Sequence, residues 1–247
     1  MAEFLLVHGS CHGAWCWRDL IPALAALGHV ARAIDLPAHG ADRTPPQEAT
    51  LDLYVARILA AIEAPVTLVG HSAAGYPITL AAERAPDRIA RLVYLCAYVP
   101  VPGLSMIEMR RAGPRQMLQG AVRAAPDGVT YTVDPARARD RFYHDCSAEA
   151  VASACAHLCP EPILPQATPL PPLSRWPGVE RHYIRCENDE AIPPEYQVTM
   201  AAGFPAGHVT TLPTSHSPFF SAPELLARRL HAIATGPGGL SDPAGAR

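Results

Sequence analysis

The chain has 247 residues, of which 49% are hydrophobic and 17% are charged, and its formal net charge is −3. This length fits one large domain, or one domain with an insertion, that can bury a sizeable core. The small negative charge gives no electrostatic footprint for a nucleic acid or an anionic membrane. The first residues lack the basic region and long apolar stretch of a signal peptide, and no apolar run is long enough to span a bilayer. We therefore expect a cytoplasmic protein without a membrane partner.

Seven cysteines, an odd number, together with the absence of an export signal indicate reduced thiols. Cys11 with Cys16, and Cys155 with Cys159 around His157, have spacings that could suggest a metal site. No matching second pair of ligands stands near either pair. We expect buried structural cysteines and no bound metal.

Short apolar strands alternate with amphipathic helices over the first hundred residues and again near the end of the chain. Apolar runs predict strands at residues 4–8, 29–34, 66–70, 89–97, 181–186 and 208–212. Helical patterns predict helices at residues 15–27, 50–63, 73–84, 193–202 and 222–234. This alternation predicts an α/β fold with a mostly parallel central sheet and helices on both faces.

The alternation stops between residues 100 and 177, where proline, arginine and alanine are frequent. Within this segment we expect a hairpin, with strands at 129–133 and 141–143, and a helix at 148–158. A loop of this length without a function would be unusual. The segment is therefore expected to be an inserted cap, or lid, over the open end of the sheet.

This pattern divides the chain into a core and an insertion. The core is expected to consist of residues 1–99 and 178–235, on either side of the cap. Residues 236–247 contain mainly glycine, proline, alanine and serine, and we expect a disordered tail or a cloning remnant.

Residues 70–75 have the pattern of a nucleophile elbow, because small residues surround a serine between a predicted strand and a predicted helix. In such a turn the serine adopts a strained conformation, and its neighbours two positions away must be small. Gly70 meets this requirement. Ala74 replaces the usual glycine, and we interpret it as a tolerated variant next to Gly75. Ser72 could instead be an ordinary helix N-cap, so its role depends on partner residues elsewhere.

A serine nucleophile needs a base, and the base needs an orienting acid, in the chain order serine, acid, histidine. His216 lies between the last predicted strand and the last predicted helix, where it could reach the serine, although it could also be a surface histidine. The acid is expected in the loop after residues 181–186, which holds three carboxylates. Asp189 at the tip of this loop is favoured over Glu190, and Glu187 lies too close to the strand end.

The attacked carbonyl oxygen becomes an oxyanion, which needs preorganised hydrogen-bond donors. One expected donor is the backbone N–H of Ala73, where the helix dipole also favours a negative charge. The second is the backbone N–H of Ser10, in the glycine-containing loop of residues 8–13. A phosphate-binding loop is disfavoured, because this loop lacks the lysine and the glycine spacing of such motifs.

Several segments closely resemble the α/β-hydrolase superfamily. They are Val-His-Gly-Ser-Cys-His-Gly-Ala-Trp-Cys-Trp at 7–17, Asp-Leu-Pro-Ala-His-Gly at 35–40 and Gly-His-Ser at 70–72. Within the superfamily the chain resembles the plant methylesterase and hydroxynitrile lyase group and its bacterial esterase relatives. Residues 187–197 match the acid-bearing segment of that group, which selects Asp189. The resemblance covers nearly the whole chain before the tail and is weakest in the cap.

Two departures from the hydroxynitrile lyases bear on the reaction. Those lyases carry threonine just after the first histidine of the oxyanion loop and lysine directly after the catalytic histidine, whereas this chain has Gly9 and Ser217. Without a cation beside His216, nothing would stabilise a cyanide leaving group. The resemblance therefore favours ester hydrolysis over cyanohydrin cleavage. Epoxide hydrolases and dehalogenases of the superfamily need aspartate in place of Ser72.

The sequence thus predicts a cofactor-independent serine carboxylesterase with Ser72, Asp189 and His216 as its catalytic residues. It would cleave small, largely apolar esters through an acyl-enzyme intermediate. The alternatives are a hydroxynitrile lyase-like enzyme, a lactonase or an amidase on the same scaffold, or a catalytically silent ligand-binding protein.

The pocket is expected to be apolar and walled by the cap. Its candidate substrate-binding residues are His12, Tyr98, Phe142 and Tyr143, of which the last three could instead serve only in packing. The expected partner is a small-molecule ester, and the resemblance suggests a homodimer.

Overall fold

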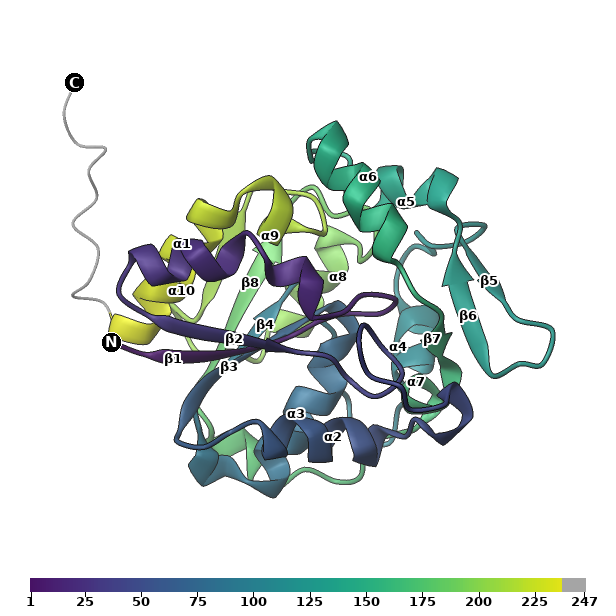
Figure 1. Ribbon diagram of the computed structural model, residues 1–247. Coiled ribbons are helices and arrows are strands. Elements are labelled where there is room, and N and C mark those ends of the chain that lie inside the picture. Colours follow the sequence, from purple (N-terminus) through teal and green to yellow (C-terminus); the bar gives the residue numbers. More distant parts are fainter. Residues whose placement is uncertain (237–247) are drawn as a thin grey trace.

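The computed structural model describes residues 1–236, and at its centre lies a sheet in which every neighbouring pair of strands is parallel (Figure 1). The strands are β1 (Glu3–Val7), β2 (Val30–Ile34), β3 (Val66–His71), β4 (Ile89–Leu95), β8 (Arg181–Cys186) and β9 (Val209–Leu212). Their order across the sheet is β2-β1-β3-β4-β8-β9. The order switches direction at β1 and β3, and the carboxyl ends of such neighbours are the usual ligand site of an open parallel sheet.

Helices cover both faces of the sheet, because successive strand residues point to opposite sides. The helices are α1 (Leu20–Ala26), α2 (Leu51–Ala60), α3 (Gly75–Arg84), α8 (Pro194–Ala201), α9 (Pro218–Ser221) and α10 (Pro223–Thr235). In β1, Phe4 and Leu6 join the apolar cluster of α1 and α10, whereas Leu5 and Val7 join that of α2 and α3. Figure 1 shows these two helix pairs on opposite sides of the sheet. The predicted α/β fold is confirmed.

The helix predicted at residues 15–27 is wrong in its extent. The chain instead forms the 3₁₀ helix η1 (Ala14–Trp17) and then α1, which begins at Leu20. Pro22 explains the break, because a proline inside a continuous helix would clash with the carbonyl four residues earlier. Beginning the helix at Leu20 places Pro22 in the first turn, where no backbone N–H has an intrahelical partner. Short 3₁₀ helices also occur at η2 (Pro46–Glu48), η3 (Ser72–Ala74), η4 (Pro86–Arg88) and η5 (Trp176–Gly178).

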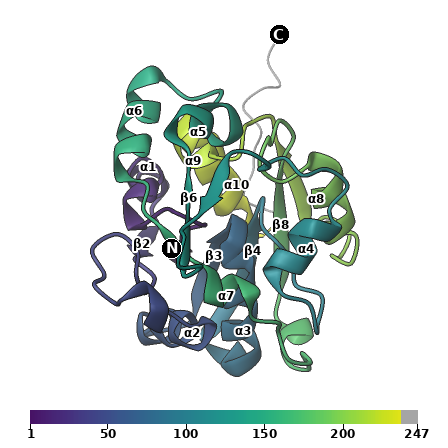
Figure 2. The same ribbon diagram turned by 90° about the vertical axis from the view of Figure 1, so that its right-hand side faces the viewer.

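The cap segment, residues 100–177, follows β4 in the chain, and most of it lies over the carboxyl ends of the central strands (Figures 1 and 2). Its last residues lie at the end of α3 instead, where the N–H groups of residues 174–176 donate to Glu83. Its elements are α4 (Met106–Ala112), β5 (Val122–Ala124), β6 (Thr130–Val133), α5 (Pro135–Phe142), α6 (Ala148–His157), β7 (Glu161–Pro162) and α7 (Ile163–Ala167). The three strands form a small antiparallel sheet in the order β5-β6-β7.

The prediction of a hairpin in this segment is correct for one strand and wrong for the other. The strand expected at 129–133 is present as β6, but it pairs with β5 rather than with residues 141–143, which lie at the end of α5. The physical reason is the helix start at Asp134, whose side chain accepts the N–H of Ala136 and is followed by a proline at the first helical position. The helix expected at 148–158 is present as α6.

No helix among residues 1–236 is long and apolar enough to cross a membrane. The expected tail lies outside the described residues, apart from Gly236.

The closest packing at the end of β3 falls on Gly75 rather than on Ala74. The loop after β4 crosses the start of α3, and there the N–H of Tyr98 donates to the Ser72 carbonyl at 3.1 Å. A Cβ on Gly75 would overlap the carbonyl oxygen of Tyr98, whereas the methyl group of Ala74 is accommodated in the core. Position 75 therefore requires glycine, whereas position 74 has room for a methyl group. This explains why alanine is tolerated at position 74, where the pattern usually has glycine.

Replacing Gly75 with alanine is expected to destabilise the protein by about 1–3 kcal/mol or more, because the obstructing atom is backbone and cannot rotate away. Gly178→Ala is the matched control, since no atom lies within 4 Å of a Cβ at that position. Urea unfolding of the two variants and the wild-type protein measures the difference. Equal stability of the two variants would contradict this account of Gly75.

Candidate active site

Ser72 has a left-handed backbone conformation, with φ of +56°, directly after the end of β3. This region costs a non-glycine residue on the order of 1–3 kcal/mol and persists only where the surroundings enforce it. Here β3 ends at His71 and the 3₁₀ helix η3 begins at Ser72 itself. The sharp turn places the serine at the wall of a cavity that residues of the cap segment also line.

His216 and Asp189 lie in contact, with 2.7 Å between imidazole Nδ1 and carboxylate Oδ2. Both side chains are buried. Since a carboxylate only accepts hydrogen bonds, Nδ1 carries the proton and Nε2 of a neutral His216 keeps a lone pair. The other two carboxylates of this loop do not contact His216. Glu190 pairs with Arg141 of the cap at 3.2 Å, and Glu187 is exposed.

Asp189 accepts three further hydrogen bonds that fix its orientation. The N–H groups of Ala191 and Ile192 donate to Oδ1 at 2.7 and 2.8 Å. The Gln197 amide donates to Oδ2 at 2.9 Å from helix α8. Gln197 also accepts the N–H of Cys186 at 3.0 Å, so it ties the acid to the end of β8. Such second contacts hold the carboxylate in the geometry that His216 requires.

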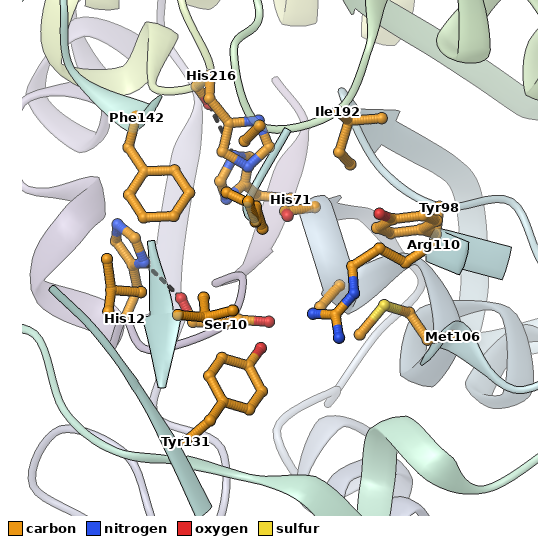
Figure 3. A pocket seen from close by; sticks show the side chains of 16 residues that line it. Ser10, His12, His71, Tyr98, Met106, Arg110, Tyr131, Phe142, Ile192 and His216 are labelled. Atoms are coloured by element: carbon orange, nitrogen blue, oxygen red, sulfur yellow. Dashed lines mark hydrogen bonds between the residues drawn. The ribbon is translucent and has the colours of Figure 1, made fainter. Parts of the chain in front are cut away.

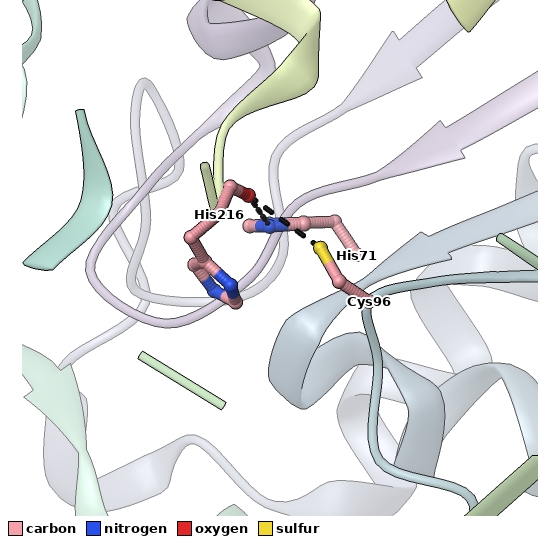
Figure 4. Close-up of side chains that lie close together, drawn as sticks. All are labelled: His71, Cys96 and His216. Atoms are coloured by element: carbon pink, nitrogen blue, oxygen red, sulfur yellow. Dashed lines mark hydrogen bonds between the residues drawn. The ribbon is translucent and has the colours of Figure 1, made fainter. Parts of the chain in front are cut away.

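Figure 4 shows His71 and Cys96 directed at the backbone carbonyl of His216. His71 Nε2 donates to this oxygen at 2.8 Å, and the Cys96 thiol lies 3.5 Å from it. Burial lowers the pKa of His71 and raises that of Cys96, so both groups are neutral. In residues 1–236 these three side chains also form the one cluster with metal-ligand spacing. The donors of His71 and Cys96 are engaged with the His216 carbonyl, so these two side chains position His216.

The loop after β1 lies against Ser72, because β1 and β3 are neighbours with Val7 opposite Gly70. A Cβ on Gly9 would lie 2.8 Å from the Ser72 Cβ and 2.8 Å from His71 Nδ1. Glycine is therefore the residue that lets the loop approach this closely.

The two expected oxyanion donors line the same cavity as Ser72 and His216. Ala73 lies in the first turn of η3, where backbone N–H groups have no intrahelical acceptor. The hydroxyl of Ser10 accepts a hydrogen bond from Gln166 of the cap at 2.7 Å. Within residues 1–236, the backbone N–H of Ser10 is not engaged by any protein acceptor.

The cavity measures about 30 Å³, enough for about two water molecules. Its wall is largely apolar (Figure 3). Of the expected substrate-binding residues, His12, Tyr98 and Phe142 line it. Ser72 and His216 both line it, without a hydrogen bond between their side chains.

Tyr143 is not a lining residue, contrary to expectation. It is fully buried, and its hydroxyl lies 2.6 Å from Nε2 of His12. Burial lowers the pKa of His12 to about 4, so the ring is neutral. Nδ1 then donates to the Ser10 carbonyl at 2.7 Å and Nε2 accepts from Tyr143. Tyr143 thus fixes the His12 ring, which in turn donates to the loop of residues 8–13.

Glu161 joins the cap to the same loop and forms a buried ion pair with His39. Glu161 of β7 accepts the N–H of Cys11 at 2.7 Å and lies 2.9 Å from Nε2 of His39. The other ring nitrogen of His39 faces the carbonyl of Pro37 at 3.0 Å. Both nitrogens face acceptors, so the ring is protonated. Burial by itself lowers the pKa of His39, but the Glu161 carboxylate outweighs it and the net shift is upward.

Since the folded-state pKa of His39 lies above its unfolded value of about 6.5, the pair stabilises the fold fully below that pH. This contribution is lost as the pH rises through the raised pKa. Glu161→Gln should therefore cost about 1–3 kcal/mol near pH 6, and the deficit should shrink at higher pH. Urea unfolding from pH 5.5 to 9 measures it.

Glu195→Gln is the control for this experiment, because its partner Arg115 keeps its charge throughout the range. A deficit for Glu161→Gln that stays constant with pH would show that His39 does not titrate in the pair.

The seven cysteines are all free thiols, with Cys11 and Cys16 buried and Cys155 and Cys159 only partly buried. The expectation of buried structural cysteines is therefore wrong for the second pair. Cys155 lies on α6, a short amphipathic helix of the cap that is partly exposed.

Sequence reasoning missed three residues that shape the site. Gln197 lies within the acid-bearing segment 187–197 but received no role of its own, although a polar residue on the buried face of a helix is a signal for a specific partner. His71 precedes the serine, and nothing local shows that it reaches the carbonyl of His216. Arg110 lines the cavity from α4, and no sequence pattern marked it.

Comparison with known proteins places the chain among hydrolases. The model of the alpha/beta hydrolase family matches residues 4–229. Esterase PIR7B of Oryza sativa subsp. japonica is 31% identical over 94% of this chain and 95% of its own length. Methylesterase 2 of Arabidopsis thaliana is 30% identical over 94% and 95%. The crystal structure of a pyrethroid hydrolase from Sphingobium faniae JZ-2 superposes with a TM-score of 0.84 at 29% identity, covering 97% and 99%.

The chain therefore belongs to the alpha/beta hydrolase family, and the family resemblance found in the sequence is confirmed. Relatives named as esterases and methylesterases support ester hydrolysis as the class of reaction.

Proposed function

We propose that this protein is a serine carboxylesterase that uses Ser72 as nucleophile, His216 as general base and acid, and Asp189 as the orienting acid. The observation that carries the proposal is the shared cavity: a strained turn exposes Ser72 to the same small space as His216. Nδ1 of His216 donates to the buried carboxylate of Asp189, which leaves Nε2 for the serine. This is the arrangement that serine nucleophiles require.

In the proposed reaction His216 Nε2 takes the proton of Ser72 as its oxygen attacks the ester carbonyl. The backbone N–H groups of Ser10 and Ala73 stabilise the oxyanion, each contributing about 3–4 kcal/mol to the barrier reduction. The C–O bond to the alcohol then breaks, and His216 gives its proton to the leaving oxygen. A water molecule, deprotonated by His216, cleaves the acyl-enzyme and restores Ser72. No step needs a cofactor.

Two features favour ester hydrolysis over cyanohydrin cleavage. Gly9 has no room for a larger side chain without displacing Ser72 or His71, so the threonine typical of the lyases does not fit here. Ser217, which follows His216, is fully buried and neutral, so it brings no cation to the base. A lactonase or an amidase would use the same residues, and a small cavity admits only compact substrates of any of these classes.

Ser72→Ala should lower turnover of p-nitrophenyl acetate by at least about 10³-fold and abolish labelling by a fluorophosphonate probe. Ester hydrolysis is read from p-nitrophenolate release, and the labelled peptide is identified by mass spectrometry. Ser153→Ala is the matched control, because its hydroxyl bonds to Arg18 at the protein surface.

Wild-type protein that neither turns over the ester nor reacts with the probe would identify a silent ligand-binding protein instead. Turnover that survives Ser72→Ala would sink the serine mechanism.

A further inference from the structure

Arg110 brings a positive charge into the cavity that contains Ser72. Ser105 is the N-cap of helix α4 and forms a reciprocal capping box with Glu108. Arg110 lies in the last turn of the helix. A cation at the end of a helix often only complements the helix dipole. Here, however, the side chain lines the cavity instead, and Figure 3 shows its guanidinium directed inward near Met106 and Ser10.

The guanidinium has no protein counter-ion. Among residues 1–236, Arg110 takes part in no ion pair and its side chain donates no hydrogen bond. Burial raises the pKa of Tyr98 while the charge of Arg110 opposes this, which places the guanidinium near that ring. A partly desolvated cation without a partner is costly unless a ligand supplies the anion.

A second hollow of about 330 Å³ adjoins the cavity and shares Tyr98, Arg110 and Leu118 with it. Two more arginines line this outer hollow, Arg111 and Arg115, of which Arg115 is paired with Glu195. In the described part of the chain no aspartate or glutamate lines either space. Within residues 1–236, Arg110 and Arg111 thus line these spaces without a paired carboxylate, which favours the arrival of anions.

We propose that Arg110 is a substrate-binding residue and that the substrate is an ester carrying a carboxylate, such as the monoester of a short dicarboxylic acid. This inference rests on the esterase function proposed above and names its substrate class. The planar guanidinium suits a carboxylate, which it binds through two parallel hydrogen bonds. Ser72 and Arg110 line the same cavity, so one substrate could present its ester carbonyl to the serine and its carboxylate to the guanidinium.

The test compares monomethyl succinate, glutarate and adipate with their neutral dimethyl esters. The wild-type protein should have a kcat/KM at least tenfold higher for one monomethyl ester than for its dimethyl ester. Arg110→Gln should lower this ratio by about 10- to 100-fold, mainly through KM of the monoester. Arg110→Lys keeps the positive charge but loses the planar guanidinium. Its ratio should fall between those of the wild-type protein and Arg110→Gln.

Arg137→Gln is the control for charge alone, because it removes one positive charge from an exposed site on α5 and should preserve the ratio. A ratio that Arg110→Gln leaves unchanged, or a wild-type preference for the dimethyl esters, overturns the proposal. Cyanide release from mandelonitrile that depends on Arg110 would overturn it as well, since the cation would then serve a lyase.

Binding separates this proposal from the esterase function itself. In Ser72→Ala protein, which cannot form the acyl-enzyme, isothermal titration calorimetry should detect the monoester and show at least tenfold weaker binding when Arg110→Gln is added. Absence of turnover of all the esters would refute the esterase proposal, whereas equal binding by the single and double variants would refute the role of Arg110.

Discussion

The left-handed turn at Ser72 is the constraint around which the rest of the site is built. A non-glycine residue keeps this conformation only where its neighbours leave no alternative, and here they belong to three segments of the chain. Gly9 brings the loop after β1 within van der Waals distance of the serine, and Gly75 lets the loop after β4 cross the start of α3. Gly70 packs under the side chain of Ile78. The parallel order of β1, β3 and β4 sets all these approaches at one edge of the sheet.

A buried polar network fixes the partner side of the cavity. Asp189 accepts four hydrogen bonds, from His216, Gln197 and two backbone amides. His216 is held at both ends, because its ring meets Asp189 and its carbonyl meets His71. Such a connected network rigidifies a site, since a displacement of His216 would leave buried polar groups unpaired. The cap also contacts the site through Glu161, which accepts the N–H of Cys11 in the loop after β1.

The central sheet could be predicted from the sequence because its signals are local. Each core strand is a short apolar run between turn residues, and the predicted strand at 181–186 coincides with β8. The cap was harder to predict, because short strands there depend on distant partners. Residues 126–128, Pro-Asp-Gly, are a turn signal ahead of β6, which the prediction of a partner at 141–143 did not take into account. The aromatic pair at 142–143 suggested a strand, but the Asp134 cap and the proline after it start a helix.

At the site, the order of residue types along the chain and their loops pointed to Ser72, Asp189 and His216. What the sequence could not give is side-chain direction. Tyr143 and Phe142 are adjacent, yet Phe142 lines the cavity while Tyr143 turns to His12. Arg110 is a basic residue in the last turn of α4, which is an ordinary position for an arginine. Only the packing of α4 over the sheet brings its side chain into the cavity.

A crystal structure of the protein after reaction with a methylphosphonate ester tests the central claim most directly, because the adduct mimics the tetrahedral intermediate. The account predicts a covalent bond to Oγ of Ser72, with the phosphonyl oxygen about 2.7–3.1 Å from the backbone nitrogens of Ser10 and Ala73. An adduct on another residue, or a phosphonyl oxygen directed away from these two amides, would contradict it.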